Sequence, residues 1–201
     1  MEIPVVVSDG IQELITMGVG RAAGMLNRLT GAHVTLRVPE VEILSGSAFP
    51  AGQRPAEESS LVSQQYQGLL SGMTILAIPR QSAIHLVTIL TGEEGGAAGM
   101  DALRIETLLE VGNILISAIM SSLCVLLETR LTYGFPGYQA SPGDVSLPPE
   151  LDPGTGRIIS AAITFEVQQR TIQGNLILIL SAGSFDALQD RIITLAGREE
   201  P

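Results

Sequence analysis

One pattern of polar residues and proline occurs twice in the chain, and this repeat constrains the fold more than any other feature. In each copy an acidic residue is followed by Glu four positions later, by a short polar residue after three more, and by proline after another 23. The two sets are Asp9, Glu13, Thr16 and Pro39, and then Glu106, Glu110, Asn113 and Pro136. Each member of the second set lies 97 positions after its counterpart (113 − 16 = 97). The chain is therefore built from two copies of one unit, which differ in chemistry at Thr16 against Asn113.

The end of the unit repeats as clearly as its start. Segment 72–82 aligns with segment 174–184 at an offset of 102 (174 − 72 = 102), so the second copy holds five more residues in a loop. Surface loops tolerate such changes in length. We predict a single domain over 1–201, made of repeat 1 (1–97) and repeat 2 (98–201), because neither junction resembles a long flexible linker.

Local patterns predict the same order of elements in each half. Apolar residues at helical spacing predict long helices over 11–30, ending at Gly31, and over 102–129, after the N-cap Asp101. Alternating residues predict strands over 33–44, 61–70, 73–78, 131–139, 157–169 and 171–180, with a tight turn at 71–72. Ser82 and Ser184 are predicted to cap two shorter helices. Loops are predicted over 45–60, 91–100 and 141–156, which are rich in Gly, Pro and polar residues.

Three strands with one apolar face cannot bury that face alone, so the halves need each other. The sequence therefore predicts an α+β fold. In it, two pseudo-symmetric helix–three-strand–helix repeats share one antiparallel sheet core, and the two long helices lie on the outer face.

Composition excludes several classes of function. The formal net charge is −10, which is the opposite of the basic surface that nucleic-acid binding requires. All 11 basic side chains are Arg, so a phosphate-binding P-loop lysine and Schiff-base chemistry are excluded. The single Cys, the absence of a basic-then-apolar leader and the polar residues within the uncharged stretch 111–127 predict a soluble, cytoplasmic protein without membrane insertion.

Glu106, Glu110 and Asn113 fall on one face of their predicted helix, because positions i, i+4 and i+7 lie within one stripe. Ser117 and Cys124 continue nearly the same line in an otherwise apolar helix. The simpler interpretation is the solvent face of an amphipathic helix. The few, short polar residues and the recurring distance to proline favour a functional site instead.

The residues Glu110-Val-Gly-Asn113, with Pro136 after 22 intervening residues, resemble the active-site signature of the CheC/CheX/FliY phosphatases of bacterial chemotaxis. That signature reads Asp or Ser, three residues, Glu, two residues, Asn, 22 residues, Pro. The first half, from Glu13 through Gly31 to Val41, resembles a first copy of the same element. The resemblance covers essentially the whole chain, and two copies in this length are typical of CheC.

The resemblance implies hydrolysis of the aspartyl phosphate of a CheY-type response regulator. Asn113 would position the attacking water, because a neutral amide can bind water without repelling the phosphoryl oxygens. Glu110 would contact a lysine of the partner. No cofactor of its own is implied, and any Mg²⁺ would belong to the phosphorylated partner.

Two residues depart from the signature. Glu106 stands where the family has Asp or Ser, so we assign it to partner binding. Thr16 stands where the first copy would have Asn. Its short hydroxyl group cannot replace the amide that would hold the attacking water. The first site is therefore predicted to be degenerate as a catalyst, with Asp9 and Glu13 still available to bind the partner.

The remaining candidates have structural interpretations. Pro39 and Pro136 are predicted to end or kink strand pairing. Cys124 is predicted to be a packed core thiol, and the unclustered His33 and His85 predict no metal site.

Two alternatives remain open. The chain could be a weakly catalytic adaptor that binds and regulates the receptor deamidase CheD, as CheC-type proteins do. It could also be a flagellar switch component, because the FliM middle domain shares the fold without the catalytic residues. Retention of Glu110 and Asn113 argues against the switch component.

Overall fold

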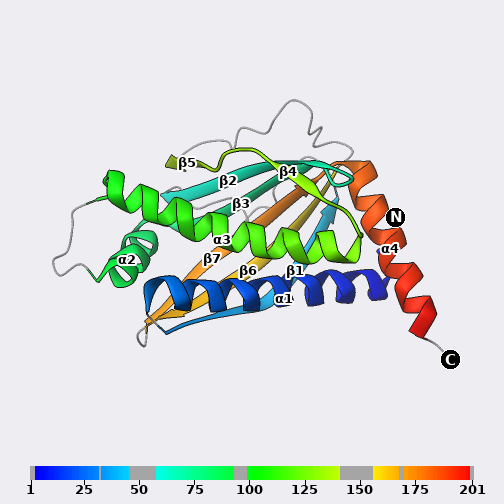
Figure 1. Cartoon of the computed structure of the whole chain (residues 1–201), viewed down its shortest axis with the longest axis horizontal. Coiled ribbons are helices and arrows are strands. Elements are labelled where there is room, and N and C mark those ends of the chain that lie inside the picture. The colour runs from blue at the N-terminus through cyan, green and yellow to red at the C-terminus, as the bar shows by residue number, and fades with distance from the viewer. Residues whose placement is uncertain are drawn as a thin grey trace.

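The computed structural model describes residues 3–31, 33–45, 58–92, 99–140, 156–167 and 170–199. Within these ranges it has four helices and seven strands (Figure 1). In chain order they are α1 (Val5–Thr30), β1 (Val34–Ser45), β2 (Ser59–Gly68), β3 (Gly72–Pro79), α2 (Arg80–Thr91), α3 (Ala102–Leu126), β4 (Leu131–Tyr133), β5 (Gly137–Ala140), β6 (Arg157–Val167), β7 (Arg170–Leu180) and α4 (Ala182–Glu199).

The strands of the two halves alternate in one antiparallel sheet. Its order is β1-β6-β7-β3-β2-β4, and β5 also pairs with β2. The first strand of each half thus pairs with the second strand of the other half, β1 with β6 and the β4–β5 chain with β2. The last strands, β3 and β7, meet at the centre. The predicted α+β fold with one shared antiparallel sheet is confirmed.

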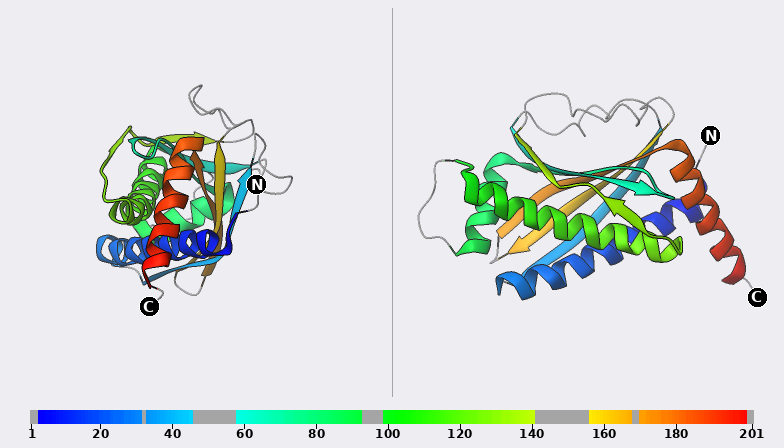
Figure 2. Two further views of the ribbon diagram at one scale, coloured as in Figure 1. Left: turned by 90° about the vertical axis from the view of Figure 1, so that its right-hand side faces the viewer. Right: turned by 45° about the horizontal axis from the view of Figure 1, so that its top comes forward.

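The long helices α1 and α3 lie on the same face of the sheet and pack against each other (Figure 2). Their backbones approach closely at Gly18, where a Cβ atom would lie 2.5 Å from the Ile119 Cα atom. By length and composition α3 could cross a membrane, but 61% of its most apolar 18-residue window is buried inside the protein. Its apolar surface therefore serves the core, as in the central helix of a soluble protein.

Alternating residues of the central strands belong to two apolar layers, one on each side of the sheet. Leu76 packs with the helices in the larger core cluster, whereas its neighbours Ile75 and Ala77 belong to a smaller cluster with Ile177. Successive side chains of a strand point to opposite faces, so these two clusters lie on the two sides of the sheet. The strands are apolar on both faces and hold the long helices on a rigid base.

Several predicted boundaries were wrong. Helix α1 begins at Val5 rather than near residue 11, because Val7 and Ile11 are both buried and extend its apolar face. Helix α2 begins at Arg80, so Ser82 is not its cap. The Ser184 hydroxyl binds the backbone of Ser71 instead of capping α4. The predicted turn at 71–72 is also displaced, since Gly72 is already the first residue of β3.

The predicted strand 131–139 is two short strands, β4 and β5, separated by residues 134–136. Both prolines of the repeat lie at such breaks. The pairing of β1 with β6 shifts register between Arg37 and Glu40, around Pro39, and Pro136 immediately precedes β5. Proline has no amide proton to donate to the ladder, which accounts for an interruption at each position. Most of the loops predicted over 45–60, 91–100 and 141–156 lies outside the described residues.

Candidate functional site

Helix α3 presents the polar stripe that the sequence predicts. Its N-cap is Asp101, as predicted, and the Asp101 carboxylate accepts a hydrogen bond from the Arg104 backbone N–H at 2.9 Å. The same carboxylate forms an ion pair with the Arg104 side chain. This cap fixes the start of the helix and therefore the direction in which the next turns point.

Glu106 and Glu110 are exposed on the following two turns, and Asn113 is half-buried beside them. The Asn113 Oδ1 atom accepts a hydrogen bond from the Ser117 Oγ atom at 3.5 Å. The Asn113 Nδ2 group makes no hydrogen bond with any of the described residues. The amide is thus held on one side and open to water on the other.

Gly112 sets the depth at which α3 sits on the sheet. A Cβ atom there would lie 2.5 Å from the Val62 Cγ1 atom of β2, closer than any side chain could approach. The height of the neighbouring residue Asn113 is therefore set by the contact of the α3 backbone with the Val62 side chain of β2. No local sequence pattern around Gly112 indicates this positioning role.

The β4–β5 connection runs beside this helix. The Gly134 N–H donates to the Gln65 carbonyl at 3.0 Å, and the Gln64 Nε2 atom donates to the Gly134 carbonyl at 3.0 Å. The next residue, Phe135, is 100% exposed. The ring is therefore accessible to a binding partner, and its backbone is held in place on both sides of Gly134.

Cys124 and Tyr133 join the end of α3 to β4. Burial, followed by the neighbouring Cys124, raises the pKa of Tyr133 to about 12. Burial also raises the pKa of Cys124, more than its hydrogen bond with Tyr133 lowers it. The prediction of a core position was wrong, since Cys124 is half-buried and lines a surface pocket with Ser121 and Arg130. It lies at the end of the apolar helix, where the core gives way to solvent.

The first copy of the site lies on α1. Asp9, Glu13 and Thr16 are all exposed. The Thr16 Oγ1 atom donates to the Gln12 carbonyl oxygen of its own helix at 2.7 Å. The position that corresponds to Ser117 is Gly20 (117 − 97 = 20), which has no side chain to orient a neighbour. The first copy therefore lacks both the amide and the hydroxyl that supports it.

The structure does not bring the two sites together. The first half of α1 lies beside α4, whereas the first half of α3 lies beside α2 (Figure 1). His33, in the connection before β1, and His85, on α2, are both exposed. Within the described ranges, no group of three or more His, Cys, Asp or Glu side chains is arranged to hold a metal ion.

Solved structures with this arrangement include FliY, FliM middle domains and the chemotaxis protein CheX. FliY of Thermotoga maritima superposes with a TM-score of 0.70 and 18% sequence identity, covering 96% of this chain and 99% of that one. The FliM middle domain of H. pylori gives a TM-score of 0.70 at 9% identity, covering 94% and 99%. CheX of Desulfovibrio desulfuricans gives 0.56 at 13% identity, covering 83% and 99%.

The chain has the CheC/CheX/FliY fold. The resemblance expected from the sequence motif is thereby confirmed for the fold. No protein-family model matches the chain, and comparison with curated protein sequences gives no significant match. At these levels of sequence identity, the residues of the site rather than the fold must carry any argument about activity.

In this CheC-type fold, three residues that matter for the site carried little or no signal in the sequence. The roles of Gly112 and Phe135 depend on the tertiary structure around them, which the local sequence does not indicate. Ser117 stood in the helical stripe but had no assigned role. Its spacing of one turn after Asn113 was the available signal, since i, i+4 side chains can reach each other.

Proposed function

We propose that the chain is a chemotaxis phosphatase that removes the aspartyl phosphate of a CheY-type response regulator, mainly through the α3 site. The substrate is an acyl phosphate, which already has a good leaving group. The catalyst therefore needs chiefly to hold a water in line with phosphorus. Asn113 would do this, because an amide can bind water through its N–H groups or Oδ1 without adding negative charge.

The observation that carries this proposal is the state of the Asn113 amide. It is neither sealed in the core nor saturated, since one bond from Ser117 orients it and its Nδ2 group has no partner among the described residues. An amide that is oriented but unoccupied suits the binding of a water molecule.

Docking would place the regulator over the exposed stripe. Glu110 lies one turn before Asn113 and is free to form a charge-assisted contact with a lysine of the regulator. Glu106, one turn further out, would extend that contact, and Phe135 would supply an apolar anchor. Neither carboxylate needs a metal for these roles. Any Mg²⁺ would belong to the phosphorylated aspartate of the regulator, and the reaction would take place in the cytoplasm.

The α1 copy would bind without catalysing. Thr16 uses its hydroxyl proton on its own helix, so it cannot donate the same proton to a water. Asp9 and Glu13 remain exposed and could still contact a basic residue of the partner. Activity would accordingly come from one site per chain.

A second candidate is a binding module without significant activity, for example an adaptor that regulates the deamidase CheD. The similarity to the FliM middle domain favours this class, because its TM-score equals that of FliY. One structural neighbour is FliM of H. pylori in complex with FliG, so this fold also serves protein binding. The exposed Glu110 and the open amide of Asn113 support the phosphatase over the adaptor.

Loss of phosphate from a panel of phosphorylated CheY-type regulators tests the proposal. Asn113→Ala should abolish the acceleration, and Thr16→Ala, the matched change in the other copy, should leave it nearly unchanged. Far-UV circular dichroism would verify that both variants are folded. The reverse order of effects, or no acceleration with any regulator, would contradict the phosphatase assignment. Retained binding of CheD by an inactive chain would favour the adaptor.

A further inference from the structure

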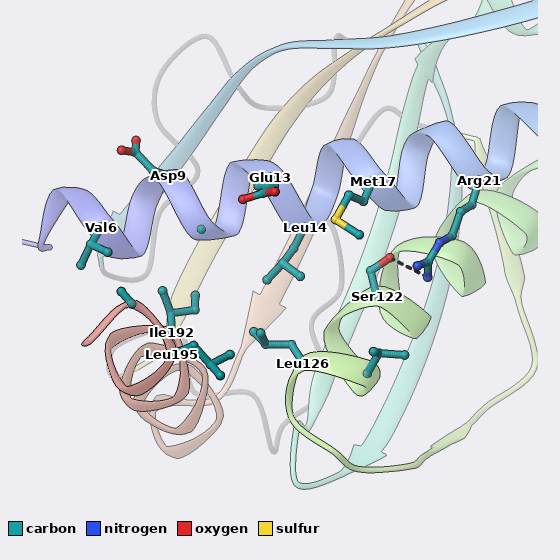
Figure 3. Close-up of a pocket in the computed structure, with 13 residues that line it drawn as sticks. Val6, Asp9, Glu13, Leu14, Met17, Arg21, Ser122, Leu126, Ile192 and Leu195 are labelled. Atoms are coloured by element: carbon teal, nitrogen blue, oxygen red, sulfur yellow. Dashed lines mark hydrogen bonds between the residues drawn. The ribbon is translucent and has the colours of Figure 1, made fainter. Parts of the chain in front are cut away.

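A pocket of about 460 Å³ lies between the N-terminal half of α1, the C-terminal end of α3 and α4 (Figure 3). Three contacts fix its corners. Helix α4 meets α1 at Gly10, where a Cβ atom would lie 2.8 Å from the Ile192 Cγ2 atom. Helix α1 meets α3 where the Arg21 Nη1 atom donates to the Ser122 Oγ atom at 3.3 Å.

The third corner joins α3 to α4. The Arg191 Nε atom donates to the Leu126 carbonyl at 3.0 Å, near the end of α3, and the same guanidinium pairs with Glu128. A cation at this position also interacts favourably with the helix dipole. The pocket is therefore bounded on three sides by helices that are tied to one another, so it is a built feature of the fold.

Large apolar side chains that are exposed to solvent gather at this pocket. Val6 is 41% exposed, Met17 is 46% exposed and Val125 is 67% exposed, although all three line the same cavity. Leu14, Leu126 and Leu195 complete its apolar walls. A cluster of this kind on a soluble protein marks a site of interaction rather than an ordinary surface.

The pocket also has an acidic edge. Asp9 and Glu13 lie one turn apart on α1 and are among the residues that line the pocket. They stand at its rim, and the Asp9 carboxylate points away from α4 (Figure 3). Neither carboxylate has an ion-pair partner among the described residues. The basic residue of the pocket, Arg21, is held by Ser122 at the far end. Two like charges at i, i+4 destabilise a helix slightly, so a bound cation would relieve their repulsion.

We propose that this pocket binds a basic amphipathic helical segment of a partner protein. The lining residues of α1 extend from Val6 to Arg21, a span of roughly 22 Å along the helix, which matches the length of a short helical segment. Apolar anchors one turn apart would enter between the three helices. Arg or Lys residues beside them would reach Asp9 and Glu13. The acidic edge and the net charge of −10 disfavour nucleic acid and anionic membrane surfaces.

This inference goes beyond the proposed phosphatase activity, because it gives Asp9 and Glu13, which could also contact the regulator, a second class of partner. Asp9 and Glu13 belong to the copy of the repeat that lacks the amide, and α4 and the end of α3 supply the other walls. In this arrangement the first copy of the repeat has become a docking surface of different chemistry from the α3 site.

Fluorescence anisotropy of the full chain with labelled peptides tests the proposal. The probe is a helix of about 16 residues with Leu on one face and Arg on the other, long enough to match the pocket. Its controls are the same peptide with Glu in place of Arg, and a scrambled peptide of the same composition. We expect saturable binding of the Arg peptide, weaker binding of the scrambled peptide and none of the Glu peptide, with affinity falling as salt rises.

Variants of exposed residues locate the site without disturbing the core. Val125→Lys should weaken binding by about tenfold or more, which is about 1.4 kcal/mol. Leu29→Lys, equally exposed but outside the pocket, should have no effect. Asp9→Asn with Glu13→Gln should weaken binding and flatten its salt dependence, whereas Glu106→Gln with Glu110→Gln should not. The Asn113→Ala variant should bind the peptide normally. A failure of the phosphatase proposal can therefore be distinguished from a failure of this one.

Several results would overturn the proposal. These are the absence of saturable binding, equal binding of the Glu peptide, or normal binding by Val125→Lys. Sedimentation of the chain alone provides a further check, because a dimer that Val125→Lys dissociates would mean that a second copy fills the pocket. Binding to anionic lipid vesicles that the same variant abolishes would assign the pocket to a membrane surface instead.

Discussion

Ser117 lies one turn after Asn113 on α3, and its Oγ atom donates a hydrogen bond to the Asn113 Oδ1 atom at 3.5 Å. The bond is long, and in this orientation the Oδ1 atom of the amide faces the next turn of α3. A residue that orients a catalytic side chain affects turnover through geometry rather than through its own chemistry.

Ser117→Ala should therefore lower the rate of phosphate release by roughly threefold to tenfold, the effect of one net hydrogen bond on a barrier. The change should have little effect on KM, because docking relies on other residues. Ser121→Ala, an exposed serine one turn further along, is the matched control. In an Asn113→Ala background the Ser117 change should have no additional effect, and an additive loss would mean that Ser117 acts separately.

Gly112→Ala should destabilise the fold and impair the site together. The new Cβ atom would lie 2.5 Å from the Val62 Cγ1 atom, so α3 must move away from β2. Overpacking of this kind costs about 1–3 kcal/mol, which thermal or urea unfolding would measure. Gly20→Ala is the matched control, since nothing lies within 4 Å of its Cβ position. That change should stabilise α1 by about 0.5–1 kcal/mol.

The repeat explains how much of the fold could be predicted from the sequence. Two copies of one helix–strand unit, each too small to bury its own sheet, require a shared core, and the interlocked pairing of β1 with β6 and of β5 with β2 satisfies that requirement. Helix ends marked by local chemistry, such as Asp101 and Gly31, were also predictable. Ends decided by tertiary packing, such as the start of α1 at Val5, were not.

Some residues of the candidate site could likewise be predicted from the sequence, and others could not. Glu110 and Asn113 were accessible to sequence reasoning because their spacing places them on one helical face. Gly112 and Phe135 were not, because the role of each depends on a residue distant in sequence or on exposure. The pocket residues of α4 could not be predicted either, because no local sequence pattern indicates where the last helix packs.

Phe135→Ala should raise the KM for the phosphorylated regulator and leave kcat nearly unchanged. The ring is 100% exposed and contributes nothing to the core, so its removal should not affect stability. Its backbone is tethered through Gly134, which keeps an exposed anchor in place without ordering cost on binding. Steady-state kinetics with one regulator would measure the effect, and Ile193→Ala, which changes an exposed apolar residue of α4, would serve as control. An unchanged KM would exclude Phe135 from the docking surface.

Cys124 should react slowly with iodoacetamide near neutral pH. Burial raises the pKa of its thiol, so the reactive thiolate is scarcer at any pH below that value than in an ordinary cysteine. The modification rate should rise steeply only above the ordinary thiol pKa and should increase when urea unfolds the chain. Mass spectrometry of the modified chain would follow both rates. Fast modification of the native chain at pH 7 would contradict the predicted shift.

The degenerate first copy should be repairable in two steps. Thr16→Asn alone places an amide on α1, but Gly20 offers no hydroxyl to orient it, so we expect little added activity. Gly20→Ser supplies that hydroxyl in an open position, since nothing lies within 4 Å of the Gly20 Cβ site. The double variant in an Asn113→Ala background should recover measurable phosphate release, whereas each single variant should not. Equal activity of Thr16→Asn with and without Gly20→Ser would mean that the amide alone suffices and that the Ser117 hydrogen bond has no catalytic role.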